Sequence, residues 1–246
     1  MPLRRTALAW SSLVLALACG VAALLAGVGY RMVWWSLGTG IGMIRWAATV
    51  ALGAAALGLV ATGLAYRAGA TRAVWIAIAA LLAGLAVAAP PIVLWRQAQQ
   101  LPHIHDVSTD TDHPPTYVTV VPLRKGARNP VDYQAAAAPE QKRGYADIVP
   151  LDLPVPPEQA FARAERAARA MGWEIVVVSP QDGRIEATDT SLLFGFKDDV
   201  VVRVAAQAGG SRVDVRSLSR VGGSDFGVNA KRIRAFLKRM AADPGP

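Results

Sequence analysis

Long apolar stretches separated by short polar turns dominate the first hundred residues of the chain. Three runs hold no charged residue, and they cover about residues 7–30, 46–66 and 73–95. Each run reaches the roughly 20 apolar residues that a helix needs to cross the hydrocarbon core of a bilayer. Tryptophans and tyrosines flank the runs, as is typical of side chains at headgroup depth. The pattern predicts three transmembrane helices within residues 1–96.

Prolines interrupt the next stretch, residues 97–144, too often for a regular helix. We therefore expect an irregular linker segment here, with one short strand near residues 117–123. The six prolines are Pro102, Pro114, Pro115, Pro122, Pro130 and Pro139.

Two amphipathic helices are predicted in the remainder of the chain. The first covers about residues 156–171 and starts with Pro156–Pro157, which suit a first turn. The second covers about residues 225–241. In each case apolar residues recur at the spacing of one helical face. The two apolar stripes consist of Phe161, Ala164, Ala168 and Met171, and of Phe226, Ala230, Ile233, Leu237 and Met240.

Five strand-like runs surround the first of these helices. They cover about residues 147–155, 173–178, 184–188, 200–206 and 212–218, and turns rich in proline, glycine and aspartate separate them. The order β-α-β-β-β-β-α predicts an α+β fold, with an antiparallel sheet that carries both helices on one face. We expect this soluble domain to occupy residues 145–241 and a disordered tail to occupy residues 242–246.

Charge divides the chain at the same place. The first 105 residues contain seven arginines and no Asp, Glu or Lys, which leaves 19 of the 26 basic residues and all 18 acidic ones in the rest. The soluble part is therefore almost neutral, and a nucleic-acid partner is not expected. Arg4 and Arg5 favour a cytoplasmic N-terminus, so an odd number of spans predicts a periplasmic domain in the bacterial inner membrane.

Cys19 is the single cysteine, and an intrachain disulfide is therefore excluded. The preceding Leu17–Ala18 leaves lipoprotein cleavage at Cys19 open as an alternative. Ala16 is not the branched aliphatic residue typical of that signal, and the apolar run continues beyond the cysteine. We therefore favour a plain buried thiol.

The three histidines of the chain provide one candidate for chemistry. Imidazoles and carboxylates are ligands of divalent ions such as Zn²⁺, but the spacing matches no metal signature and the segment lacks regular structure. A loop in which these side chains form turns and caps is the alternative. The cluster consists of His103, His105, Asp106, Asp110, Asp112 and His113.

The turn from the last strand into the last helix is a candidate anion site. Free backbone N–H groups at a helix start can hold a phosphate or carboxylate, although an acidic N-cap would occupy the same donors. In the alternative, structural interpretation, Arg220 pairs with Asp225 or with Asp199. The candidate residues in this segment are Ser219, Arg220, Asp225, Asn229 and Arg232.

The polar face of the expected sheet adds Arg203 and Arg216 to the candidate binding residues. Both lie on strands in which valines alternate with polar side chains, so they share one face. Asp198 and Asp199 are neighbours on a strand and point to opposite faces, which argues against a catalytic carboxylate pair.

Several of these blocks together resemble one known family. They are residues 104–110, 196–203 and 217–222, followed by Asp225, Gly227, Asn229, Ala230 and Arg232. Over about residues 103–241 the chain is similar to the bacterial and plastid family catalogued as domain of unknown function 1499. The resemblance implies a periplasmic domain, since some members are extracytoplasmic lipoproteins and others carry several N-terminal spans. Lipoprotein-type members carry a cysteine in the segment corresponding to residues 106–111, where this chain has none. This difference argues against a shared thiol or metal site.

These observations favour a membrane-anchored domain that binds a partner protein or an envelope component, without a cofactor. Two alternatives stay open. One is a metal-dependent or anion-binding hydrolase that uses the histidine cluster or the Arg220–Arg232 segment. The other is a lipid-binding module, because basic residues of the last helix can approach anionic headgroups.

Overall fold

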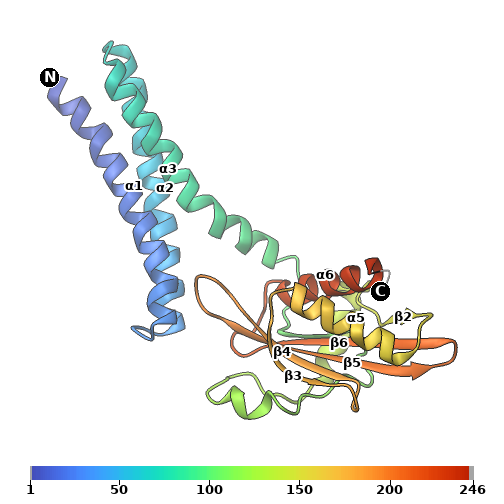
Figure 1. The fold of residues 1–246 in the computed structure, drawn as a ribbon. Helices are drawn as coiled ribbons and strands as arrows, with labels where there is room; N and C mark the ends of the chain where they lie inside the picture. The colour runs from blue at the N-terminus through green and yellow to red at the C-terminus, as the bar shows by residue number, and fades with distance from the viewer. Residues whose placement is uncertain (1, 244–246) are drawn as a thin grey trace. The chain divides into compact units, whose positions relative to one another are not determined.

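The computed structural model describes residues 2–243 and divides them into two compact units (Figure 1). One unit contains the chain up to Gln97 together with Leu192–Gly195. The other contains Ala98–Ser191 and the chain from Phe196 onward. Most of the expected C-terminal tail, from residue 244, lies outside the described residues.

Three helices form the first unit: α1 (Pro2–Arg31), α2 (Leu37–Arg67) and α3 (Thr71–Ala98). All three are long and apolar enough to cross a membrane, which confirms the helices expected from the sequence. Pro90 and Pro91 lie inside α3 and do not end it. Ser36 begins α2 by accepting a hydrogen bond from the Thr39 N–H at 3.2 Å.

Glycines allow α2 and α3 to approach closely. A Cβ atom added at Gly58 would lie 2.8 Å from the Leu81 nitrogen, and one added at Gly84 would lie 2.6 Å from the Ala51 oxygen. Any larger residue at these positions would push the helices apart. Association through small residues is typical of helices in lipid, where contact depends on close packing.

A six-stranded antiparallel sheet forms the centre of the second unit. The strand order is β1-β6-β5-β4-β3, and β2 pairs with the part of β6 that β1 leaves free. Strand β6 therefore has three partners. The strands are β1 (Asp106–Ser108), β2 (Leu151–Leu153), β3 (Glu174–Ser179), β4 (Arg184–Thr190), β5 (Lys197–Gln207) and β6 (Gly210–Ser219).

Helices α5 (Pro157–Ala170) and α6 (Val228–Ala242) cover one face of this sheet (Figure 1). Alternate valines of β5 and β6 point toward them and are fully buried, together with Ile233 and Phe236 of α6. The Phe236 ring stacks on Trp173 with centroids 5.3 Å apart. The predicted α+β class, with both helices on one face of an antiparallel sheet, is confirmed.

Residues 109–134, which we call the strap, pack against the opposite face. The strap contains the short 3-10 helix η1 (Val121–Arg124), and Tyr117 and Val120 pack on Val201 and Leu218 in a second, smaller core. A further turn η2 (Ala135–Ala137) and helix α4 (Ala138–Gly144) lead on to β2. The stretch expected to be a linker thus groups with the sheet and supplies strand β1. Residues 117–123 form no strand.

Helix α6 starts three residues later than the apolar pattern suggests. Gly227 adopts a left-handed conformation with φ of 78° and ends the preceding turn, so the helix begins at Val228. Phe226 consequently lies outside the helix and is 58% exposed, whereas the pattern placed it in the buried stripe.

We expect a fragment of residues 98–246 to unfold in one cooperative thermal transition, measured by circular dichroism. A fragment of residues 145–246 should show no such transition, because it lacks β1 and the strap that cover buried charges of the sheet. Equal cooperativity of the two fragments would contradict this structural role of the strap.

Candidate functional site

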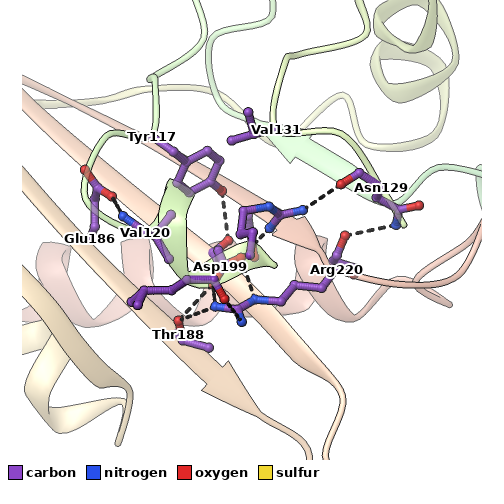
Figure 2. A network of polar contacts seen from close by, with 12 residues as sticks. Tyr117, Val120, Asn129, Val131, Glu186, Thr188, Asp199 and Arg220 are labelled. Atoms are coloured by element: carbon purple, nitrogen blue, oxygen red, sulfur yellow. Dashed lines mark hydrogen bonds and ion pairs between the residues drawn. The ribbon is translucent and has the colours of Figure 1, made fainter. Parts of the chain in front are cut away.

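Asp199 of β5 lies at the centre of the polar network on the strap side of the sheet (Figure 2). Its side chain is fully buried and accepts hydrogen bonds from Arg124, Arg220 and Thr188. The Arg220 Nε and Nη2 atoms lie 3.0 and 2.8 Å from the two carboxylate oxygens, and the Thr188 hydroxyl lies 2.8 Å away. Two cations therefore share one buried anion.

Further hydrogen bonds of these arginines hold the strap together and connect it to the chain after β6. Arg124 donates to the Asn129 carbonyl at 3.0 Å, and Arg220 donates to the Leu123 carbonyl at 2.8 Å. The Asn129 amide in turn donates to the carbonyls of Ser219 and Gly222, each at 2.9 Å. The guanidinium of Arg220 is thus bound by internal acceptors on both sides.

Glu186 of β4 is a second buried anion on this face, and it pairs with Arg184 at 3.0 Å as well as with backbone groups. Its carboxylate accepts hydrogen bonds from the N–H groups of Val118, Thr119 and Val120 at 3.0, 3.1 and 2.7 Å. Figure 2 shows the bond from Val120. Hydrogen bonds from backbone N–H groups to an ionised carboxylate are stronger than neutral ones. Glu186 thereby fixes the path of the strap.

Tyr117 fills the space between these anions. Its hydroxyl lies 2.8 Å from the Asp199 carbonyl and 3.2 Å from the Arg216 carbonyl. Burial raises the pKa of the Tyr117 phenol well above its ordinary value, so the group stays a hydrogen-bond donor.

Arg216 of β6 is only 2% exposed and pairs with Asp106 of β1. Its Nε and Nη2 atoms lie 2.9 and 2.7 Å from the Asp106 carboxylate. The guanidinium also lies over the rings of Tyr117 and Tyr133, 4.9 and 5.3 Å from their centroids. Burial raises the pKa of Asp106, although the Arg216 charge opposes that shift.

Arg232 of α6 forms the corresponding centre on the helix side of the sheet. It lies 2.7 Å from Asp198 and 2.8 Å from Asp189, and it donates to the Ser217 hydroxyl at 3.0 Å and to the Asn229 side chain at 2.6 Å. Asp198 thus lies on the face opposite to Asp199, as the alternation along a strand predicts.

Asn229 and Asp225 hold the turn between β6 and α6. The Asn229 amide donates to the Ser219 hydroxyl and to the His105 carbonyl, each at 3.0 Å. The Asp225 carboxylate accepts from the N–H groups of Gly227 and Asn229 at 3.0 and 2.6 Å. Burial raises the pKa of Asp225. The partner of Arg220 is Asp199, and Asp225 stabilises its own turn.

Arg203 lies farther along the strap face, away from this turn. It pairs with Asp214 at 2.8 Å and with Asp110 at 3.3 Å, and Arg212 joins the same two carboxylates. The pKa of Asp110 is lowered: burial acts to raise it, but hydrogen bonds from the backbone of His113 and Asp112 and the charges of Arg212 and Arg203 prevail.

The three histidines do not gather into a common site. The His103 N–H donates to Glu140, the His105 carbonyl accepts from Ser219, and the His113 N–H donates to Asp110. Among residues 2–243, no group of three or more His, Cys, Asp or Glu side chains has a geometry suited to a metal ion.

The structure therefore brings five of the sequence-derived candidates together at one end of β6: Ser219, Arg220, Asp225, Asn229 and Arg232. Arg216 of β6 and Arg203 of β5 lie on the strap face of the sheet, farther from this end. The sequence analysis missed Arg124 and Glu186, and it named Asp106 only as a possible metal ligand and not as the partner of Arg216. For Glu186 the sequence contained a signal. Its neighbours Ile185 and Ala187 point to the helix side of the sheet, so alternation puts Glu186 on the polar face.

A cleft of about 410 Å³ lies beside Asp110. Gln141 anchors one wall, because its amide exchanges hydrogen bonds with the backbone of Ser108 at 2.6 and 3.0 Å. The rim carries an exposed ion pair, Lys142 with Asp112 at 3.2 Å, and Val149 is 54% exposed. The cleft therefore offers both charges and an apolar surface.

These features define a class of protein: three helices long and apolar enough to span a membrane, followed by an α+β domain whose sheet carries buried ion pairs on both faces. The chain belongs to the family described as protein of unknown function (DUF1499), whose model matches residues 106–240. That range starts at the first residue of β1 and includes the strap, the whole sheet and almost all of α6. No curated protein and no solved structure showed significant similarity to the chain.

The Asp199 network leads to a quantitative expectation. Asp199→Ala should destabilise the domain by about 3–5 kcal/mol, because it leaves two arginine charges uncompensated. Arg220→Ala should destabilise it less, by about 1.5–3 kcal/mol, since Arg124 continues to pair with Asp199. The double variant should be less destabilised than the sum. Urea unfolding of the full chain in detergent, followed by near-ultraviolet circular dichroism, measures these differences.

Arg239→Ala is the matched control, because the Arg239 side chain is exposed on α6 and its loss should change stability by no more than about 0.5 kcal/mol. Strictly additive effects of the two network substitutions would contradict a shared ion pair.

Proposed function

We propose that this chain is an inner-membrane protein of bacteria whose periplasmic domain binds a partner protein or an envelope component in the cleft beside Asp110. The location of the domain relative to the membrane and the binding of a ligand in the cleft are supported by different observations.

The odd number of membrane-spanning helices supports the proposed location. The structure has three helices long and apolar enough to span, and an odd number of spans supports a domain on the side opposite to the N-terminus. Arg4 and Arg5 precede the first span, and basic residues near a first span favour the cytoplasmic side.

The cleft supports the proposed binding of a ligand, and its mixed surface is the observation that carries the proposal. Its volume of about 410 Å³ falls in the range of ligand sites, roughly 300–1,000 Å³. The side chains of Lys142 and Asp112 are 58% and 73% exposed, so a ligand can replace their mutual contact at small cost. Val149 adds an exposed apolar surface. A peptide segment that carries both charges next to an apolar residue matches this chemistry.

The arginine networks favour binding over anion-dependent hydrolysis. Arg220 and Arg232 donate to carboxylates, carbonyls and hydroxyls of the domain itself. An incoming anion would have to displace these internal acceptors, at the cost of unpairing buried charges. A ligand that replaces the contact between Lys142 and Asp112 would unpair no buried charge, because both side chains are exposed.

Topology is tested by fusing alkaline phosphatase and green fluorescent protein separately after Met240. A periplasmic domain should give phosphatase activity without fluorescence, since the phosphatase needs an oxidising compartment and the fluorescent protein does not mature after this export route. Fluorescence without phosphatase activity would reverse the orientation.

Binding in the cleft is tested by photo-crosslinking in native membranes. A photoreactive amino acid at Val149 should give a discrete adduct, whereas the same group at Ala208, in the β5–β6 hairpin, should not. Lys142→Ala should reduce the adduct several-fold, and the fold should be unaffected because an exposed ion pair contributes only about 0–1 kcal/mol. Identical adducts from Val149 and Ala208 would contradict a ligand site in the cleft.

A further inference from the structure

Exposed apolar side chains occur on two segments that meet at the C-terminal end of β6. Leu123 is 54% exposed and Phe226 is 58% exposed, and Val121 and Val228 are also exposed. They belong to two segments far apart in sequence: Val121 and Leu123 to η1, Phe226 to the turn that precedes α6, and Val228 to the first position of α6. Four such residues on two neighbouring loops are more than the isolated exposed side chains expected on any surface.

Hydrogen bonds hold these two loops against each other. Arg220 donates to the Leu123 carbonyl at 2.8 Å, the Arg128 N–H donates to the Arg220 carbonyl at 2.9 Å, and Asn129 donates to Gly222. The Asp225 N–H donates to the Ile104 carbonyl at 3.0 Å, which joins the same loops to the entering chain. The exposed side chains are thus carried by a connected framework.

The backbone at Phe226 is unusual for its residue type. Its φ is 53°, in the left-handed region that a non-glycine residue adopts only at an energetic cost. Gly227 beside it also has a positive φ. The turn therefore carries an exposed aromatic side chain at a position where the backbone is strained. A glycine at this position would adopt the same backbone conformation without strain.

Positive charge accompanies these apolar side chains. From Thr116 to Val131 the chain contains Arg124, Lys125 and Arg128 and no acidic residue. Arg124 is buried in the Asp199 pair, whereas Lys125 and Arg128 are exposed. Apolar residues next to exposed cations are typical of surfaces that insert into the interface of an anionic membrane.

The chain itself limits how far this surface can lie from a bilayer. Helix α3 ends at Ala98, and only five residues separate it from Ile104, a reach of about 20 Å when fully extended. Trp95 and Arg96 near the end of α3 suit headgroup depth. Strand β6 is ten residues long, so its other end, at the Gly210 hairpin, lies about 30 Å from the end at Ser219.

We propose that this end of the domain is a second membrane contact, in which Leu123 and Phe226 insert into the interface and Lys125 and Arg128 bind anionic lipid headgroups. This inference goes beyond the proposed function and does not depend on the cleft or on the topology, because both leaflets of a synthetic vesicle can carry the same lipids.

The test uses the full chain with Cys19→Ala and one new cysteine, Leu123→Cys or Phe226→Cys, labelled with an environment-sensitive fluorophore. Ala208→Cys in the β5–β6 hairpin is the matched control. The variants are reconstituted in mixed phosphatidylcholine–phosphatidylglycerol vesicles that contain brominated lipid. We expect a blue shift and bromine quenching at positions 123 and 226, and neither at position 208.

Charge is tested separately with Lys125→Gln and Arg128→Gln combined. Each basic residue near an anionic surface changes binding about fivefold, so the ratio of inserted to free label should fall about 25-fold. Vesicles of phosphatidylcholine alone should give a similar loss.

Three results would overturn the proposal. The first is the absence of quenching at positions 123 and 226. The second is a blue shift without quenching, which would show that the label lies against protein, in the same or a second copy of the chain, and not against lipid. The third is equal quenching at position 208. Undiminished insertion without anionic lipid, or after both charge substitutions, would remove the headgroup role of Lys125 and Arg128.

Discussion

The soluble domain depends on the burial of charged side chains on the strap face of its sheet. Asp199 and Glu186 are completely shielded from solvent, and burying an ion costs several kcal/mol unless partners in fixed positions offset the loss of water. The strap supplies part of that set: Arg124 for Asp199 and three consecutive N–H groups for Glu186. The strap is therefore held in place although it is irregular, because its displacement would remove hydrogen bonds from both buried anions.

This constraint separates residues that maintain the fold from residues free to contact something else. The arginines that stand out in the sequence, Arg216, Arg220 and Arg232, all bind acceptors within the domain. Side chains open to other molecules lie elsewhere: at the cleft rim around Lys142, and on the loops that carry Leu123 and Phe226. The buried networks act as a rigid frame that positions both of these surfaces.

Periodicity in the sequence predicts much of this architecture. The uncharged runs predict the three long helices, and the alternating valines of β5 and β6 predict which face of the sheet meets α5 and α6. The strap was not predictable in this way, because a polar face covered by protein has the same alternation as one exposed to water. The strap that covers this face has no hydrophobic periodicity of its own. Strand β1 has only three residues, too few to show an alternating pattern.

Phe226 and the Arg220 turn illustrate what local patterns leave open. Phe226 fits the apolar stripe of the last helix by spacing, but the left-handed Gly227 starts that helix beyond it. Arg220 had two possible anionic partners in the sequence, and only the three-dimensional arrangement assigns it to Asp199. Spacing identifies the residues of a network, while the choice among its possible pairs depends on contacts between distant segments.

The central place of β6 also determines when the domain can form during synthesis. Its partner β1 lies far upstream, so that Arg216 and Asp106 are 110 residues apart in sequence. Strand β1 and the strap leave the ribosome first and remain without their sheet until the last strand has been made. Closing so long a loop is entropically costly, and chains dominated by such distant pairings fold slowly. The three apolar helices are therefore complete well before the domain that follows them becomes compact.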